Sequence, residues 1–273
     1  MAREAYRSLY GDLTKLKDSS LLKDPGAGTG DDDELWQLLM ATSDWVDHYC
    51  NRRFFPYRRT LEFTGPGAPK LQIEDVIEID SVKEDTTRNA SFATTWAATD
   101  YHKFPHIANP TDFWGTPFTS LILSEATTKA SFAEGTRRFQ IVGLWGYRRF
   151  IEASGTLLND AGMDTSKTTI AVDDGTKFEI GQTIFMNDEL MLISGISSND
   201  LTVTRGLNNT IAIAHTDNDP VSILRLPPAI ERAALIQAAR LWTRAAAFEP
   251  FYVSEKLDPD IKTLLAPYRK LPI

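Results

Sequence analysis

Apolar residues recur at helical spacing near both ends of the chain, and these two runs are its strongest local patterns. In residues 31–51, the acidic stretch Asp31–Glu34 precedes an apolar stripe of Leu35, Leu38, Leu39, Val46 and Tyr49. Acidic residues favour the first turn of a helix, so this run predicts a helix that begins at residue 31. Residues 228–248 follow Pro227 and predict a second long helix, with a broad apolar face formed by Ile230, Ala233, Ala234, Leu241, Ala245 and Phe248. Because both apolar faces are wide, we expect the two helices to pack together.

The ends of the chain have weaker patterns. Residues 5–17 predict a short helix, and the glycine-rich stretch 24–30 predicts a loop. The tail, residues 249–273, is too apolar for a solvated linker and is broken by prolines, although 258–269 has an amphipathic pattern. We expect the tail to bury its apolar side chains, either on a partner protein or on the core of its own subunit.

Between the helices, the pattern changes to that of strands. Residues 57–147 contain short alternating segments and turn residues, and they predict a β region. An aromatic-rich stretch within it has no clear period and predicts loops packed on the sheet; it contains Trp96, Tyr101, Phe104, Phe113 and Trp114. Residues 154–223 are rich in Thr, Asp, Asn and Gly, with turn sequences at Asn187-Asp188 and Ser198–Asp200. They predict a small β barrel or sandwich.

These patterns predict an α+β fold with two domains. A helical core, residues 1–153 and 224–273, comprises the N-terminal helix, a long C-terminal helix and the β region 57–147. The all-β module 154–223 is inserted into it. Both module boundaries fall at small or polar residues, and its strands pair locally. We therefore expect that the rest of the chain folds without it.

The composition of the chain excludes or disfavours several classes of protein and of site. The 273 residues carry 37 acidic and 29 basic side chains, a net charge of −8, which disfavours a general nucleic-acid coat. Cys50 is the only cysteine, which excludes a disulfide within the chain and a thiolate zinc site of the usual kind. The N-terminus lacks the apolar core of a signal peptide, and no segment has the roughly 20 apolar residues of a membrane span.

Candidate chemistry is sparse. His102 and His106 are four residues apart, but Pro105 disfavours the helix that would present both to a metal ion. Asp31–Asp33 lack the spacing of a calcium-binding loop and suit a helix start. The sequence therefore predicts no catalytic residue, no metal site and no cofactor, and a protein that is not an enzyme.

Arginine pairs occur at 52–53, 58–59, 137–138 and 148–149. Such pairs contact either DNA phosphates or other protein surfaces, and the acidic balance of the chain favours protein surfaces. We select as candidate interface residues Arg52, Arg53, Arg148, Arg149, Arg240, Arg244, Phe251, Tyr252, Leu264, Leu265 and Tyr268.

The order of these motifs resembles the head–tail connector, or adaptor, proteins of tailed bacteriophages. The likeness spans roughly 200 residues, and each of its motifs is weak alone. The stretches that carry it are Tyr6–Lys17 with Asp31–Trp36, Ala41–Phe55, Leu71–Asp85 with Trp96 and Asp100-Tyr101, Phe139–Tyr147, and Pro227–Leu241. Residues 154–223 depart from the shortest members of the family and are similar to β modules inserted in various phage structural proteins.

The resemblance implies a structural virion protein located in the neck and assembled in the host cytoplasm. Its subunits would form a ring that matches the twelvefold symmetry of the portal, a dodecamer, and link capsid to tail. The implied partners are other copies of the chain, the portal protein, a stopper or tail-completion protein, and genomic DNA that passes through the lumen without sequence-specific binding. No membrane is involved. The alternatives are another neck or tail protein, such as a stopper, a tail-completion protein or a fibre adaptor, and a host-surface-binding protein that uses the β module.

Overall fold

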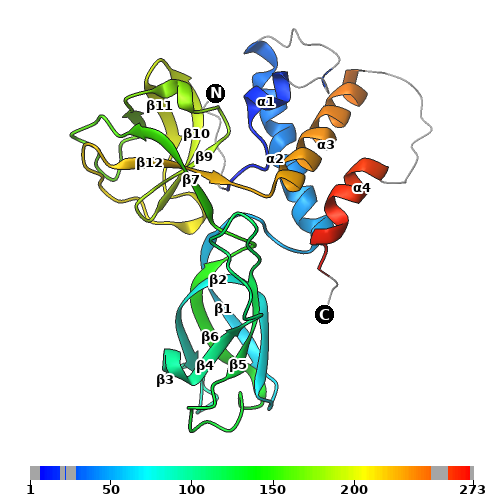
Figure 1. The fold of residues 1–273 in the computed structure, drawn as a ribbon, viewed down its shortest axis with the longest axis vertical. Coiled ribbons are helices and arrows are strands. Elements are labelled where there is room, and N and C mark those ends of the chain that lie inside the picture. Colours follow the sequence, from blue (N-terminus) through cyan, green and yellow to red (C-terminus); the bar gives the residue numbers. More distant parts are fainter. Residues whose placement is uncertain (1–6, 19–21, 23–28, 247–257, 271–273) are drawn as a thin grey trace. The chain divides into compact units, whose positions relative to one another are not determined.

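The computed structural model describes residues 7–18, 22, 29–246 and 258–270, without the side chains of Thr29 and of residues 244–246. The chain divides into two units (Figure 1). Residues 1–52 and 151–273 form one, called here the barrel–helix unit, and residues 53–150 form the other, called the sheet unit. Each unit is described by itself below.

The prediction of a helical core with a long C-terminal helix is wrong. The fold is mostly β, with two antiparallel sheets of six strands each, and 26% of it is helical. The described residues contain four α-helices, and none exceeds 19 residues: α1 (Leu13–Asp18), α2 (Asp32–Cys50), α3 (Pro228–Ala246) and α4 (Pro259–Leu265). Helical periodicity is conspicuous in a sequence, whereas short strands with mixed polarity are not, and this difference led to the error.

The two longest helices begin where the sequence predicts. Helix α2 ends at Cys50, and the following residue, Asn51, caps it: Asn51 adopts a left-handed conformation (φ 51°) and donates its backbone N–H to the carbonyls of the last turn. In α3, the backbone N–H groups of Ile230 and Glu231 bond to the carbonyl of Pro227. Residues 247 and 248 of the predicted helix lie outside the described residues. The predicted helix 5–17 is shorter in the structure, where α1 starts at Leu13; of its residues, 5 and 6 are not described.

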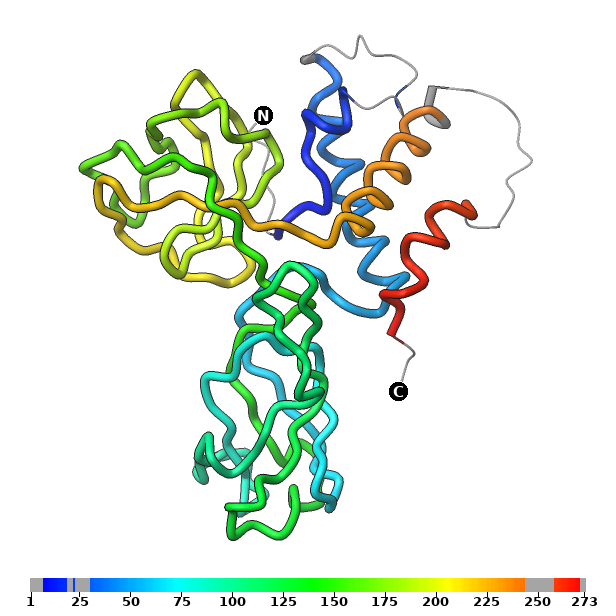
Figure 2. The backbone as a smooth tube through the Cα atoms, viewed as in Figure 1, coloured from blue at the N-terminus to red at the C-terminus, as the bar shows by residue number. Residues whose placement is uncertain are grey.

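Helices α2 and α3 pack against each other, as predicted. Their contact belongs to one apolar cluster, to which α2 contributes Leu35, Trp36 and Leu39 and α3 contributes Leu235, Ala238 and Ala239. Helix α1 also lies against both helices, although more than 200 residues separate it from α3 (Figure 2). Burying these side chains is the main source of stability for helices of this length.

Residues 151–225 form the β part of the barrel–helix unit, and its first strand begins at Phe150, the last residue of the sheet unit. The strands of this β part are β7 (Phe150–Leu157), β8 (Thr169–Ala171), β9 (Thr183–Met186), β10 (Glu189–Ser197), β11 (Asp200–Thr204) and β12 (Pro220–Arg225), in the order β7-β12-β9-β10-β11-β8. A bridge between Leu158 and Val172 joins the two ends of this order and closes a barrel. The predicted turn at Asn187-Asp188 is present between β9 and β10. Two short 3-10 helices, Gly175–Lys177 and Leu207–Asn209, lie in the connections.

Alternation along the strands gives the barrel two apolar faces. Met191 and Ile193 of β10 point into the barrel core, together with Ile184 of β9. Leu190 and Leu192 lie on the opposite face of β10 and belong to the same cluster as helices α2 and α3. The outer wall of the barrel therefore completes the core of the helices.

The segment that precedes α1 joins the barrel to α2. Ser8 is fully buried, its backbone N–H bonds to the side chain of Asn208 (3.0 Å), and its hydroxyl bonds to Thr183 (2.9 Å) and Asn208 (2.9 Å). The backbone N–H of Tyr10 bonds to Ser43 of α2 (2.9 Å), and that of Leu13 to a barrel carbonyl (2.8 Å). Buried polar groups with this many partners fix one arrangement of the three parts.

The sheet unit consists of β1 (Tyr57–Gly65), β2 (Lys70–Glu84), β3 (Thr94–Trp96), β4 (Tyr101–Phe104), β5 (Phe118–Leu123) and β6 (Gly135–Trp145). The strand order is β1-β6-β2-β5-β4, and β3 pairs with β2. Its core centres on aromatic rings: Trp96 stacks on Phe132 with ring centroids 4.7 Å apart, and Phe139 meets both edge-on. The expectation that Trp96, Tyr101 and Phe104 lie in loops is wrong, because these residues belong to strands β3 and β4.

The described part of the tail folds back onto its own unit. In α4, Ile261 and Leu265 are fully buried, and the helix packs against α3. The backbone N–H of Lys270 bonds to the carbonyl of Cys50 (2.8 Å), and Arg269 lies over the ring of Tyr49 (4.8 Å). Of the two expectations for the tail, residues 258–270 follow the one in which it covers its own subunit.

The tail arrangement predicts unequal effects for two adjacent leucines. Leu265→Ala removes a fully buried side chain and should lower the free energy of unfolding by about 2–3 kcal/mol. Leu264→Ala alters a half-buried neighbour and is the matched control, with a loss of about 1 kcal/mol or less. Denaturant melts of both variants measure the difference. Equal small losses would show that the tail does not pack on this unit.

Candidate interaction surface

The connection between β4 and β5 is a braced loop of 13 residues, 105–117, called here the tip loop. Its backbone is held by turns, in which the N–H of Ala108 bonds to the carbonyl of Pro105 (3.0 Å) and the N–H of Gly115 to that of Asp112 (3.0 Å). Gly115 lies so close to the carbonyl oxygen of Asn109 that a Cβ atom would come within 2.0 Å of it. Only glycine fits at this position without a shift of the backbone.

Arg148 anchors the tip loop to the end of the sheet. Its side chain is almost completely buried, and its guanidinium donates a hydrogen bond to the carbonyl of Phe113. The guanidinium also lies 5.3 Å from the centre of the Phe113 ring and 5.8 Å from that of Phe150. The backbone N–H of Arg149 bonds to the carbonyl of Pro110 (2.8 Å). A buried cation between two aromatic faces is a strong constraint on the loop.

Two large apolar side chains of the tip loop are left in solvent. Ile107 is 93% exposed and Trp114 is 84% exposed, although the loop around them is fixed. The Trp114 ring packs only edge-on against Phe113, with centroids 4.8 Å apart. Tryptophan on a rigid support is the residue type most enriched at binding hot spots, because little entropy is lost when a partner covers it. The tip loop is therefore a candidate interaction surface.

The anchor predicts a contrast between two adjacent arginines. Arg148→Met keeps the length of the side chain but removes the charge and the hydrogen bond, so the sheet unit should lose about 1–3 kcal/mol of stability. Arg149→Met removes a partly exposed ion pair with Glu78 (3.6 Å) and should cost less than about 1 kcal/mol. Thermal melts and limited proteolysis of the tip loop measure both. If the two variants melt at the same temperature and the tip loop is cleaved equally slowly in both, Arg148 does not anchor the loop.

The barrel carries a second braced loop, residues 206–214, called here the apolar loop. It contains no charged residue, and Ile211 within it is 75% exposed. The loop is held at both ends by the carboxylate of Glu189, which accepts the backbone N–H groups of Gly206 (3.0 Å) and Ile213 (3.1 Å). The hydroxyl of Thr210 accepts the backbone N–H of Leu190 (3.1 Å).

Glu189 is fully buried and is the centre of a network of charged groups. Arg205 donates to both of its oxygens, at 2.7 and 2.8 Å, and His215 lies 3.0 Å away through Nε2. Burial alone would raise the pKa of Glu189, but the hydrogen bonds from Arg205 and His215 outweigh burial and hold this pKa below its ordinary value. The carboxylate is therefore the stable form, and the network fixes the apolar loop rather than supplying a reactive acid.

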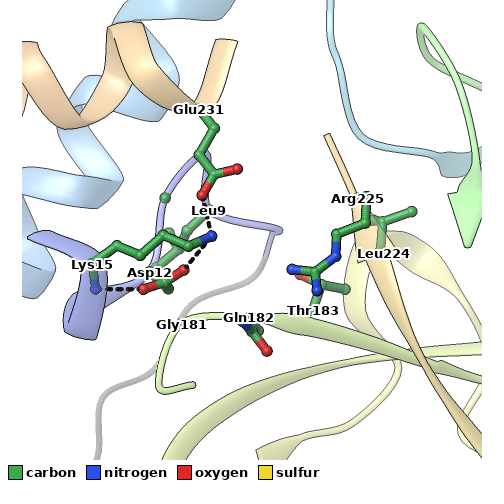
Figure 3. Close-up of a pocket in the computed structure, with 10 residues that line it drawn as sticks. Leu9, Asp12, Lys15, Gly181, Gln182, Thr183, Leu224, Arg225 and Glu231 are labelled. Atoms are coloured by element: carbon green, nitrogen blue, oxygen red, sulfur yellow. Dashed lines mark hydrogen bonds and ion pairs between the residues drawn. The ribbon is translucent and has the colours of Figure 1, made fainter. Parts of the chain in front are cut away.

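A shallow polar pocket lies in the barrel–helix unit (Figure 3). Lys15 lies between two carboxylates there, 3.1 Å from Asp12 and also bonded to Glu231 of α3. Burial raises the pKa of Asp12. Burial alone would lower the pKa of Lys15, but its interactions with Glu231 and Asp12 together outweigh burial and raise this pKa. The positive charge of Lys15 is thus balanced by the two carboxylates, and the ion pair with Glu231 stabilises the start of α3.

The candidate interface residues from the sequence fall in several places. Arg148 is the buried anchor, and Arg53 is exposed and lies over the ring of Tyr57 (4.8 Å). Leu265 is buried in its own unit, and Arg240 lies 3.2 Å from Asp258 in an ion pair within the unit. Side chains that are neither fully buried nor fully exposed are those of Arg52, Arg149, Leu264 and Tyr268. Phe251, Tyr252 and the side chain of Arg244 lie outside the described residues.

Sequence reasoning did not identify Ile107, Trp114 or Ile211 as interface residues. Trp114 was noted only as part of an aromatic stretch without a period. A tryptophan followed by glycine, in a segment with three prolines, was the available indication of an exposed turn.

Groups suited to metal or thiol chemistry do not converge in the described residues. No cluster of three or more His, Cys, Asp or Glu side chains with metal-binding geometry occurs there. The exposed rings of His102 and His106 meet edge-on at 6.1 Å. Cys50 is fully buried, and burial raises the pKa of its thiol to about 12, so it is unreactive at neutral pH.

Comparisons with known proteins give no relative. No family model, no curated protein and no solved structure matches the chain. Within the residues that the structure describes, no helix has both the length and the apolar character needed to span a membrane.

Proposed function

We propose that the chain is a structural protein of a tailed bacteriophage virion, a head–tail connector subunit that assembles into a ring beneath the portal and links capsid to tail. In this role DNA passes through the lumen, and the subunit carries out no catalysis. The motif order of the sequence supports the proposal. The structural observation that carries it is the presence of two braced, apolar contact loops, one in each unit.

A ring makes a specific demand on its subunit. Each copy touches two neighbours through two different surfaces, because head-to-tail contacts that close on themselves generate cyclic symmetry. The tip loop and the apolar loop are two such surfaces, and they differ in sequence and in the element that supports them. An acidic chain also suits a lumen that conducts DNA, since it repels phosphate and does not retain it.

Electron microscopy of the purified, concentrated protein tests this function. We expect closed rings with a central opening and about twelve subunits, the number that matches the portal in the resembled family. Particles that remain single subunits at every concentration, or open filaments without closed rings, would argue against a connector.

A further inference from the structure

The described residues expose four large apolar side chains by more than a third of their surface. Ile107 and Trp114 lie in the tip loop of the sheet unit, and Ile211 and Leu157 lie in the barrel–helix unit. Isolated exposed apolar groups are common, but three of these four lie on loops that are braced by buried charged side chains, Arg148 and Glu189. Each brace uses a buried charged side chain whose desolvation is offset by hydrogen bonds to the loop or to a partner side chain, so the bonded conformation of the loop is fixed.

We propose that the tip loop of one copy docks on the apolar loop of a second copy, with Trp114 and Ile107 of the first packed on Ile211 of the second. This is a head-to-tail contact between unlike surfaces. This docking proposal rests on the proposed function in one respect: a ring requires a head-to-tail contact, and the docking proposal names the residues that form it.

The charge distribution favours contact between unlike units of two copies over contact between two barrel–helix units. Residues 53–150 contain 12 basic and 11 acidic side chains, a net charge of +1, which leaves 17 basic and 26 acidic side chains, a net charge of −9, on the barrel–helix unit. Two barrel–helix units repel each other when they approach. A sheet unit can approach a barrel–helix unit without this repulsion, so electrostatics favours this pairing over contact between two barrel–helix units.

The surroundings of the two loops agree with this choice. Lys103 lies two residues before the tip loop, over the ring of Phe118 (4.6 Å), and its charge offsets that of Asp112 within the loop, so this end of the sheet unit presents no net negative charge to an acidic partner. The apolar loop contains no charged residue, so an apolar ring can cover it without burying an unpaired charge. Both loops are fixed before contact, which lowers the conformational entropy lost on association.

The contact is small, and a single copy of it is weak. One tryptophan buries on the order of 150–250 Å², far less than a stable dimer interface needs. In a closed ring each subunit makes the contact twice and all contacts support one another, so a weak pairwise contact still yields a stable ring. Association in solution should therefore rise steeply with protein concentration.

Thiol cross-linking between differently tagged copies tests the pairing. Cys50 is buried and its thiol has a pKa of about 12, so it does not compete with introduced thiols. Thr116→Cys places a thiol on the exposed part of the tip loop and Ala214→Cys places one on the apolar loop, and both leave the apolar contacts intact. With a short bifunctional maleimide, the mixed pair should cross-link at least tenfold faster than either variant with itself.

The same variants separate this proposal from the proposed function. In sedimentation velocity, Trp114→Ser should weaken association at least tenfold without lowering the melting temperature, and Thr116→Ala should behave as the wild type. If the wild type associates while Trp114→Ser associates equally well, or while like variants cross-link fastest, the docking proposal is wrong and ring formation stands. If the wild type does not associate at any concentration, both proposals fail.

Discussion

Removal of residues 155–222, joined by a short Gly–Ser linker, is expected to unfold the helices together with the barrel. The sequence pattern leads to the opposite expectation, but the outer wall of the barrel supplies Leu190, Leu192 and Leu207 to the cluster that holds α2 and α3. The deletion would leave the helical side of that cluster in water, at about 1.5–3 kcal/mol for each large side chain exposed. It would also remove Asn208 and Thr183, the partners of the buried Ser8.

Circular dichroism and a thermal melt of the deletion variant measure this effect. We expect little helical signal and no cooperative transition from the helices. Leu192→Ala is the milder form of the test and should cost about 2–5 kcal/mol, whereas Thr202→Ala on the exposed face of the next strand should cost less than about 1 kcal/mol. A deletion variant that keeps its helices and melts cooperatively would show that the shared core is not needed.

Glu189→Gln is expected to destabilise the barrel–helix unit by about 3–5 kcal/mol at neutral pH. The substitution keeps the shape of the side chain but removes the charge that balances Arg205, which is itself almost fully buried. It also weakens the acceptors for the backbone N–H groups of Gly206 and Ile213, so the apolar loop should become more mobile. Hydrogen exchange in residues 206–214 measures the second effect.

The same carboxylate makes stability depend on pH. The pKa of Glu189 is lower in the folded protein than in the unfolded chain, so its contribution is complete above the ordinary pKa of a glutamate. That contribution is lost as the pH falls through the lowered, folded pKa. The difference in unfolding free energy between wild type and Glu189→Gln should therefore be largest at neutral pH and shrink on acidification.

Glu152→Gln is the matched control for this prediction. Glu152 also pairs with an arginine, Arg225, but both side chains are substantially exposed, so the loss should be about 0–1 kcal/mol. Denaturant titrations at neutral and acidic pH measure all three proteins. A Glu189→Gln variant no less stable than Glu152→Gln would refute the view that Glu189 holds the apolar loop.

The sequence predicted the elements that have strong local patterns. The acidic start of α2, the Pro-Pro start of α3 and the Asn187-Asp188 turn each have a local cause, namely helix-end electrostatics or backbone geometry. In the structure this turn joins β9 and β10.

Two strands that complete the barrel have patterns too weak to be recognised in the sequence. In strand β7, apolar and polar residues alternate poorly, and Gly155 has a positive φ of +78°. Strand β12 begins at Pro220, and proline is rare inside strands except at their first residue. The packing of the barrel on the helices was also missed, although the run Leu190–Ile193 contained the indication. Four consecutive apolar residues in a strand imply burial on both faces, which an isolated module does not provide.

The candidate interaction surface depends on contacts between residues that are far apart in the sequence, and the sequence pattern does not reveal such contacts. Arg148 was selected as an interface residue because arginine pairs favour interfaces, yet it acts from inside the sheet unit by fixing Phe113. Likewise, Glu189 and His215 are 26 residues apart in sequence and meet only in the folded barrel. Long-range pairs of this kind follow from the topology, so local periodicity cannot reveal them.

Imaging the neck of the phage virion to which we assign this protein, at subnanometre resolution, tests the connector proposal most directly. We predict a ring of about twelve copies directly beneath the portal, with the sheet unit of each copy against the barrel–helix unit of the next. Density for the chain in a tail fibre or another position, or a neck complete without it, would contradict the proposal.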